Sequence, residues 1–146
     1  MAKTIRRAIL DTSILIGFTH DHPDAKMLFS TLRRERIVPC ISVMTLTEIE
    51  IGNIDERHKQ EVQKLISEFE YYSFTPEMAP RAAELLAIYK NDRQRKAHML
   101  PDAIIAATAE IERLNIYTAN YKHFRDFKLI HSEVIGYQQQ IGRAHV

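Results

Sequence analysis

Apolar residues in this chain form two kinds of run, and each kind predicts a different element. Residues 8–10 are apolar without interruption, which is typical of a strand that a parallel sheet buries on both faces. A second strand is expected at residues 37–43, and its Pro39 suggests an edge or irregular position, because proline cannot donate a backbone hydrogen bond to a neighbouring strand. Further strands are expected at residues 71–74, 115–118 and 127–130.

Between these strands, apolar positions recur every three or four residues, the spacing of an amphipathic helix. Alternation of strands and helices indicates a three-layer α/β/α sandwich with a mainly parallel central sheet. The basic segment at residues 90–98 is expected to be a loop or a fraying helix end. Helices are expected at residues 12–18, from about 24 to 34, 45–53, 56–69, 75–89 and from 100 to about 113.

Composition limits the class of protein without naming its chemistry. A chain of 146 residues is most simply one domain, residues 1–146, with 45% hydrophobic and 27% charged residues. The net charge of +1 does not by itself demand a nucleic-acid partner. Only a short apolar run follows the basic N-terminus, and no run reaches membrane-spanning length, so we expect a cytoplasmic protein. Cys40 is the only cysteine, which excludes an internal disulfide.

Three acids stand out because apolar residues surround them. Asp11 follows the first strand, Glu48 lies in a short apolar helix, and Asp102 precedes an alanine-rich run. Each also has a structural interpretation: Asp11 as a helix cap, Glu48 as the end of a capping box that begins at Thr45, and Asp102 as an acid that complements a helix dipole. Taken together, three carboxylates in such apolar contexts suggest a site for a hard cation, because Mg²⁺ and Mn²⁺ prefer oxygen ligands.

Four segments carry a resemblance to a known family. In chain order they are residues 9–13 (ILDTS), 42–52 (SVMTLTEIEIG), 101–109 (PDAIIAATA) and 117–124 (YTANYKHF). Together they resemble the PIN domain, and most closely the VapC-like toxins of toxin–antitoxin pairs. The resemblance implies an α/β/α sandwich and a ribonuclease that depends on Mg²⁺ or Mn²⁺, with its acids at the carboxyl ends of the strands.

Carried over position by position, the resemblance assigns Asp11, Glu48 and Asp102 to three family acids. The fourth position, often an acid, falls on Asn120, which removes one charge and favours one firmly held ion over two. In the resulting hypothesis, Asp11 and Asp102 hold the metal and Glu48 orients or deprotonates the attacking water. Asn120 and the Thr118 hydroxyl lie around the metal ligands without binding the ion directly. The supporting residues are Thr12 and Ser13, which follow Asp11 in the same segment.

The basic segment before Asp102 offers candidate RNA contacts, namely Arg93, Arg95 and Lys96. A solvated helix end is the alternative interpretation. His123 has no ionisable neighbour that the sequence identifies, so no role is predicted for it, and Asp126 is interpreted as a surface residue. The resemblance further implies a homodimer and a separate antitoxin protein. Two other functions stay open: an RNA-maturation nuclease of the same fold, and a non-catalytic binding module with a degenerate site.

Overall fold

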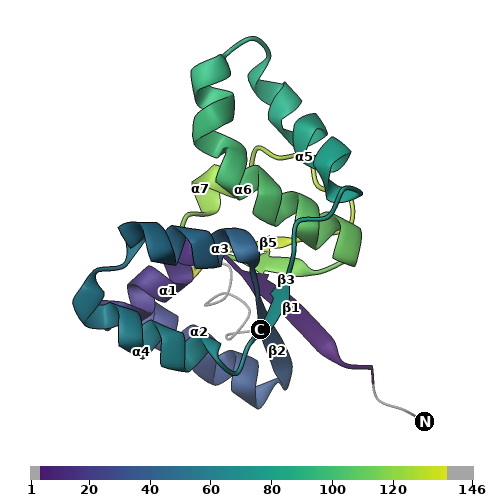
Figure 1. The fold of residues 1–146 in the computed structure, drawn as a ribbon. Coiled ribbons are helices and arrows are strands. Elements are labelled where there is room, and N and C mark those ends of the chain that lie inside the picture. The colour runs from purple at the N-terminus through teal and green to yellow at the C-terminus, as the bar shows by residue number, and fades with distance from the viewer. Residues whose placement is uncertain (1–3, 138–146) are drawn as a thin grey trace.

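A computed structural model describes residues 4–137, and a five-stranded parallel sheet lies at its centre (Figure 1). The single-domain prediction also includes residues 1–3 and 138–146, which lie outside the described residues. The strand order is β3-β2-β1-β4-β5, so the first strand of the chain is the central one. The strands are β1 (Arg6–Leu10), β2 (Ile37–Ser42), β3 (Glu70–Tyr72), β4 (Asn115–Tyr117) and β5 (Val134–Ile135).

Helices cover both faces of this sheet, which confirms the predicted three-layer α/β/α class. One face packs against α1 (Thr12–Thr19), α2 (Pro23–Arg34) and α4 (Glu56–Ile66). The other face packs against α5 (Met78–Leu86), α6 (Arg93–Glu112) and α7 (Tyr121–Phe124), and α5 and α6 form a hairpin that rises above the sheet (Figure 1). The remaining segments are α3 (Val43–Glu48), the π-helical η1 (Ile49–Asn53) and the 3₁₀ turn η2 (Ala87–Tyr89).

Side-chain alternation along β1 explains why the sequence reads as one apolar run. Ala8 and Leu10 face the layer that contains α1, α2 and α4, whereas Ile9 faces the layer that contains α5 and α6. All three side chains are buried, because both faces of a parallel sheet are covered. Among residues 4–137, no helix is both long and apolar enough to cross a membrane.

β2 as a whole is not an edge strand, because it lies between β1 and β3, but Pro39 itself lies at a local edge of the sheet. The proline is tolerated because β3 is short. Its first residue, Glu70, pairs with Cys40, so β3 has not yet begun beside Pro39. Ala8 of β1 is the sheet partner of Pro39. The next residue, Cys40, is a buried free cysteine of the core.

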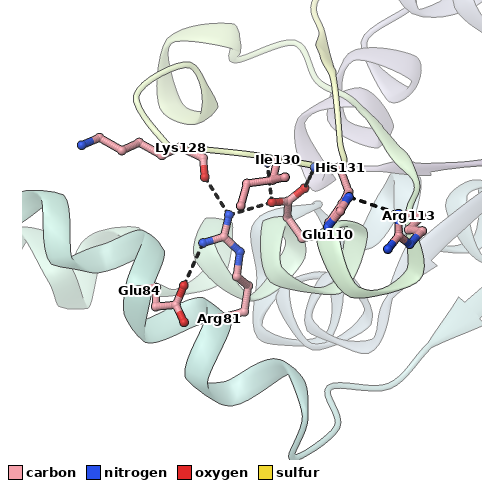
Figure 2. Close-up of polar contacts among 7 residues, drawn as sticks. All are labelled: Arg81, Glu84, Glu110, Arg113, Lys128, Ile130 and His131. Carbon is pink, nitrogen blue, oxygen red and sulfur yellow. Dashed lines mark hydrogen bonds and ion pairs between the residues drawn. The ribbon is translucent and has the colours of Figure 1, made fainter.

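The strand predicted at residues 127–130 is also wrong, because side chains satisfy this segment's backbone groups (Figure 2). Arg81 donates from Nη2 to the Lys128 carbonyl at 2.6 Å. The Ile130 and His131 N–H groups donate to the two carboxylate oxygens of Glu110, both at 2.7 Å. With these groups satisfied, the segment stays irregular and the fifth strand forms later, at Val134–Ile135.

Candidate active site

Asp11 lies where β1 ends and α1 begins, and it is only 4% exposed. Its backbone N–H donates to the Tyr117 carbonyl at 3.1 Å, which continues the pairing between β1 and β4 by one residue. Asp11 occupies the N-cap position of α1, yet its side chain makes no capping hydrogen bond. The helix-cap interpretation of this carboxylate is therefore wrong, and the side chain is used elsewhere.

Two hydroxyl groups, which we call the hydroxyl clamp, hold the Asp11 carboxylate. Ser13 Oγ donates to Oδ1 at 2.5 Å and Thr118 Oγ1 donates to Oδ2 at 3.0 Å. Each hydroxyl also accepts a backbone N–H at 2.9 Å, from Ala119 and Asn120 respectively. Because those N–H groups occupy the acceptor side of each oxygen, both hydroxyl protons are free to point at Asp11. The clamp thus joins the start of α1 to the loop after β4.

Glu48 is the last residue of α3, and Thr12 ties it to the start of α1. Thr12 Oγ1 donates to Glu48 Oε1 at 2.8 Å and lies 3.2 Å from the Thr45 hydroxyl. The capping-box interpretation is wrong, because the N-cap of α3 is Ser42, whose side chain accepts the Met44 N–H. Glu48 therefore adds a second acid close to Asp11, from an element that follows β2.

Asp102 lies in the middle of α6, and this corrects the predicted start of that helix. The helix begins at Arg93, after Asp92 accepts the Arg95 N–H at 2.9 Å as the N-cap. Pro101 lies inside the helix, where its missing N–H removes one backbone bond without ending the helix. Because Asp102 is far from the helix N-terminus, the proposed complement to the dipole is also wrong.

The structure adds two histidines that sequence reasoning missed. His123 Nδ1 lies 3.3 Å from Asp102 Oδ2, so His123 does have an ionisable neighbour. The His98 ring meets the His123 ring edge-on, with 6.5 Å between centroids. His98 precedes Asp102 by four residues, so an unbroken helix places both on one face. That signal was available, but the helix was expected to begin after His98.

The predicted acids and these histidines line one cavity of about 200 Å³ at the carboxyl edge of the sheet. Thr118 is buried behind it as part of the hydroxyl clamp. A larger hollow of about 640 Å³ lies at the opposite edge of the sheet, and no predicted site residue lines it. The lining of the smaller cavity is Asp11, Thr12, Ser13, Ile16, Glu48, His98, Pro101, Asp102, Asn120 and His123.

Burial and mutual repulsion disfavour negative charge in this cavity. Burial raises the pKa of Asp11 to about 7, and the Asp102 and Glu48 carboxylates add to the rise while the hydroxyl clamp opposes it. Burial also raises the pKa of Asp102, with a contribution from Glu48 and an opposing one from His123. A cation bound here would remove both penalties, since an opposite charge nearby favours the ionised form.

The donor set fits a hard cation that keeps much of its water. Carboxylates and the Asn120 amide supply oxygen ligands. Within residues 4–137, no three His, Cys, Asp or Glu side chains are grouped closely enough to form a metal cage. Mg²⁺ commonly binds through one or two carboxylates and several waters, so this arrangement suits Asp11 and Asp102 as the protein ligands.

The candidate RNA contacts lie outside the cavity. Arg93 and Arg95 are exposed in the first turn of α6, and Lys96 is half-buried there. The Arg95 guanidinium lies over the Tyr89 ring, 5.3 Å from its centroid. Asp126 is exposed, in agreement with its interpretation as a surface residue.

Comparisons with known proteins point to one family. The PIN domain family matches residues 8–128. Ribonuclease VapC10 of Mycobacterium tuberculosis is 28% identical over 120 residues, which cover 82% of this chain and 87% of that protein. Ribonuclease VapC2 of the same organism is 31% identical over 117 residues, covering 77% and 79%. A toxin–antitoxin complex from Klebsiella pneumoniae superposes with a TM-score of 0.62 and 32% identity, covering 80% and 89%.

Proposed function

We propose that this chain, which belongs to the PIN domain family, is a metal-dependent endoribonuclease and the toxin of a toxin–antitoxin pair. The observation that carries the proposal is the cavity where Asp11, Glu48 and Asp102 meet. These three acids are buried or half-buried, and no lysine or arginine lines the cavity. Their mutual repulsion destabilises the empty site, whereas a bound cation would be stabilised by all three. We take residues 1–146 to form one nuclease domain.

In the proposed reaction, water attacks the phosphorus of an RNA phosphodiester and the bond to the leaving ribose oxygen breaks. Glu48 orients the attacking water and takes up its proton, with Thr12 holding the carboxylate in place. The leaving oxygen gains a proton from solvent. Asn120, at the cavity wall beside Thr118, offers its amide to the water network.

Asp11 and Asp102 are the proposed metal ligands, and Mg²⁺ or Mn²⁺ is the proposed ion. When bound, such an ion would stabilise the charge that develops on the phosphate and make water a better nucleophile. The hydroxyl clamp keeps both Asp11 oxygens in fixed directions, which preorganises the ligand before any ion arrives.

The first turns of α6 are the proposed approach for RNA. Arg93, Arg95 and Lys96 lie on the helix that also carries Asp102, so phosphates held there would lead toward the cavity. Such contacts position the backbone and read no sequence. Reversing the charge at Arg93 and Arg95 should weaken RNA binding and leave metal binding unchanged.

An antitoxin protein is the proposed partner, because the Klebsiella pneumoniae relative was solved as a toxin–antitoxin complex. We further propose a homodimer, and a cytoplasmic location where RNA is available. A non-catalytic binding module is the competing function, and Asn120 in place of a fourth acid is the feature that favours it. The retained hydroxyl clamp argues against that reading, since a degenerate site has no use for a held carboxylate.

Calorimetric titration of metal-stripped protein with Mn²⁺ tests the proposal, with Asp102→Asn as the variant. The wild type should bind Mn²⁺ and the folded variant should lose binding by about tenfold or more. Asp126→Asn is the matched control, because the same change at an exposed acid should have no effect. RNA cleavage should likewise be lost in Asp102→Asn and kept in the wild type and Asp126→Asn. A wild type that neither binds Mn²⁺ nor cleaves RNA would leave the binding-module reading.

A further inference from the structure

His123 contacts the catalytic cavity from α7, an element of only four residues. The next residue, Phe124, is fully buried, and the His123 backbone N–H donates to the Asn120 carbonyl at 2.9 Å. These contacts fix the backbone of His123 while its ring reaches Asp102. The imidazole is therefore presented to the cavity by a rigid turn and not by a loose loop.

Each carboxylate of the cavity has a polar side chain that holds it. Asp11 has the hydroxyl clamp and Glu48 has the Thr12 hydroxyl. For Asp102, His123 is the one side chain within ion-pair distance among residues 4–137. His123 thus completes a set in which every acid is oriented by a neighbour.

We propose that His123 is a positioning residue for Asp102, and this inference rests on the function proposed above. The imidazole donates its Nδ1–H to Asp102 Oδ2, which fixes the rotation of the carboxylate and determines which oxygen remains available to a cation. Ligands held by a second group bind metal more tightly, because less ordering is left to the moment of binding.

Histidine suits this task because its two ring nitrogens are separate. Nδ1 is the ring nitrogen that lies near Asp102, so the proposed role requires a donor at that ring position. The His98 ring, packed edge-on against the His123 ring, restricts its rotation. His58 forms the same kind of pair with Asp55, at 2.8 Å and outside the cavity lining, so it serves as an internal control.

A role in stability alone does not account for this contact. The His123 side chain is 44% exposed and that of Asp102 is 21% exposed. Pairs with that much access to water add little to folding. Removing the imidazole should therefore change the metal site more than the fold.

Mn²⁺ titration of four variants tests the proposal. The side-chain amide nitrogen of asparagine can replace Nδ1, whereas that of glutamine reaches the position of Nε2. His123→Ala and His123→Gln should weaken Mn²⁺ binding about 10- to 100-fold, while His123→Asn should stay within about threefold of the wild type. His58→Gln, which removes a His–Asp pair outside the cavity, should resemble the wild type. Thermal unfolding of every variant in the absence of metal should agree within about 2 °C.

The outcomes separate this inference from the proposed function. Wild type that binds Mn²⁺, together with alanine and glutamine variants that bind equally well, would overturn the role of His123 and leave the nuclease intact. Equal losses in all three His123 variants would also overturn it, because the rescue by asparagine is specific to a donor at Nδ1. A wild type without Mn²⁺ binding would overturn both.

Discussion

Two carboxylates of this protein are almost equally buried, yet their environments are opposite. Asp11 is 4% exposed and Glu110 is 2% exposed. Burial raises the pKa of Asp11 to about 7, since its partners are only neutral hydroxyls and its neighbours are two more acids. At Glu110, burial is outweighed by the Arg81 guanidinium and the N–H groups of Ile130 and His131, so the pKa falls below its ordinary value.

Figure 2 shows how completely Glu110 is satisfied. Arg81 donates from Nη2 to Glu110 Oε1 at 2.6 Å, and also to the Lys128 carbonyl. Within residues 4–137, the chain thus supplies a cation, Arg81, to Glu110 and pairs no cationic side chain with Asp11. Burial alone therefore does not distinguish a structural acid from a functional one. The presence of an internal counter-charge does.

The largest effect that sharpens this comparison is the loss of cleavage in Asp11→Asn. Removing one of the two proposed metal ligands should lower RNA cleavage by at least about 1,000-fold, equivalent to roughly 4 kcal/mol of transition-state stabilisation. Steady-state cleavage of RNA measures it. Thermal unfolding should be unchanged or shifted upward, because the variant no longer buries a charge. Metal-dependent activity close to wild type would break the assignment.

Glu110→Gln should show the reverse pattern. Breaking a buried, hydrogen-bonded ion pair costs about 3–5 kcal/mol, because Arg81 keeps its charge and loses its buried partner. Urea unfolding measures the loss, and cleavage per folded molecule should be preserved.

Glu84→Gln is the matched control for this variant, because Glu84 also pairs with Arg81, at 3.1 Å, but is 67% exposed. Its cost should stay below about 1 kcal/mol. Equal destabilisation by both variants would show that the buried pair has no special weight.

In the absence of metal, Asp11 and Glu110 should make the free energy of unfolding change with pH in opposite directions. The pKa of Asp11 rises from 3.8 to about 7 on folding, so the folded state binds the extra proton. Its contribution to stability is present at low pH and is lost as pH rises toward 7, by up to about 1.4 kcal/mol per pH unit. The pKa of Glu110 is lowered, so its contribution is present at neutral pH and is lost as pH falls below 4.5.

Unfolding curves recorded from pH 4 to pH 8 check this prediction. Asp11→Asn should flatten the decline between pH 4 and pH 7, and saturating Mg²⁺ should flatten it in the wild type. Parallel curves for the wild type and the variant would contradict the raised pKa of Asp11.

The smallest expected effect concerns the hydroxyl clamp. Thr118→Val removes one donor to Asp11 at nearly constant volume, and should reduce cleavage about tenfold and stability by about 1 kcal/mol. Thr108→Val is the control: Thr108 is equally buried, but its hydroxyl donates to the Ile104 carbonyl within α6. Cleavage assays of both variants should therefore diverge, and equal losses would remove the clamp's special role.

The sequence predicted the sandwich because strand and helix periodicities are local properties. It also predicted Asp11, Glu48 and Asp102, since an acid among apolar residues is visible without a structure. Their convergence on one cavity agrees with that prediction, although their catalytic roles stay predictions.

Other features could not be predicted from the sequence. Some depend on contacts between distant residues, and in others the folded structure departs from the local sequence preference. Pro101 reads as a helix start, yet Asp92 caps the helix nine residues earlier and carries it through the proline. Glu110 lies in an alanine-rich helix with no local sign of Arg81, which is 29 positions away. The contact between His123 and Asp102 depends on the packing of α7 against α6, which no periodicity encodes.

The hydroxyl clamp also has a consequence for the stage of synthesis at which Asp11 gains both of its hydroxyl partners. Ser13 is made early, but Thr118 follows β4, the strand that completes the pairing of β1. A ribosome-bound chain that has not yet released β4 has only half of the support for Asp11. The support of Asp11 is therefore complete only after the chain has been made through Thr118, so the proposed metal site is finished late in synthesis.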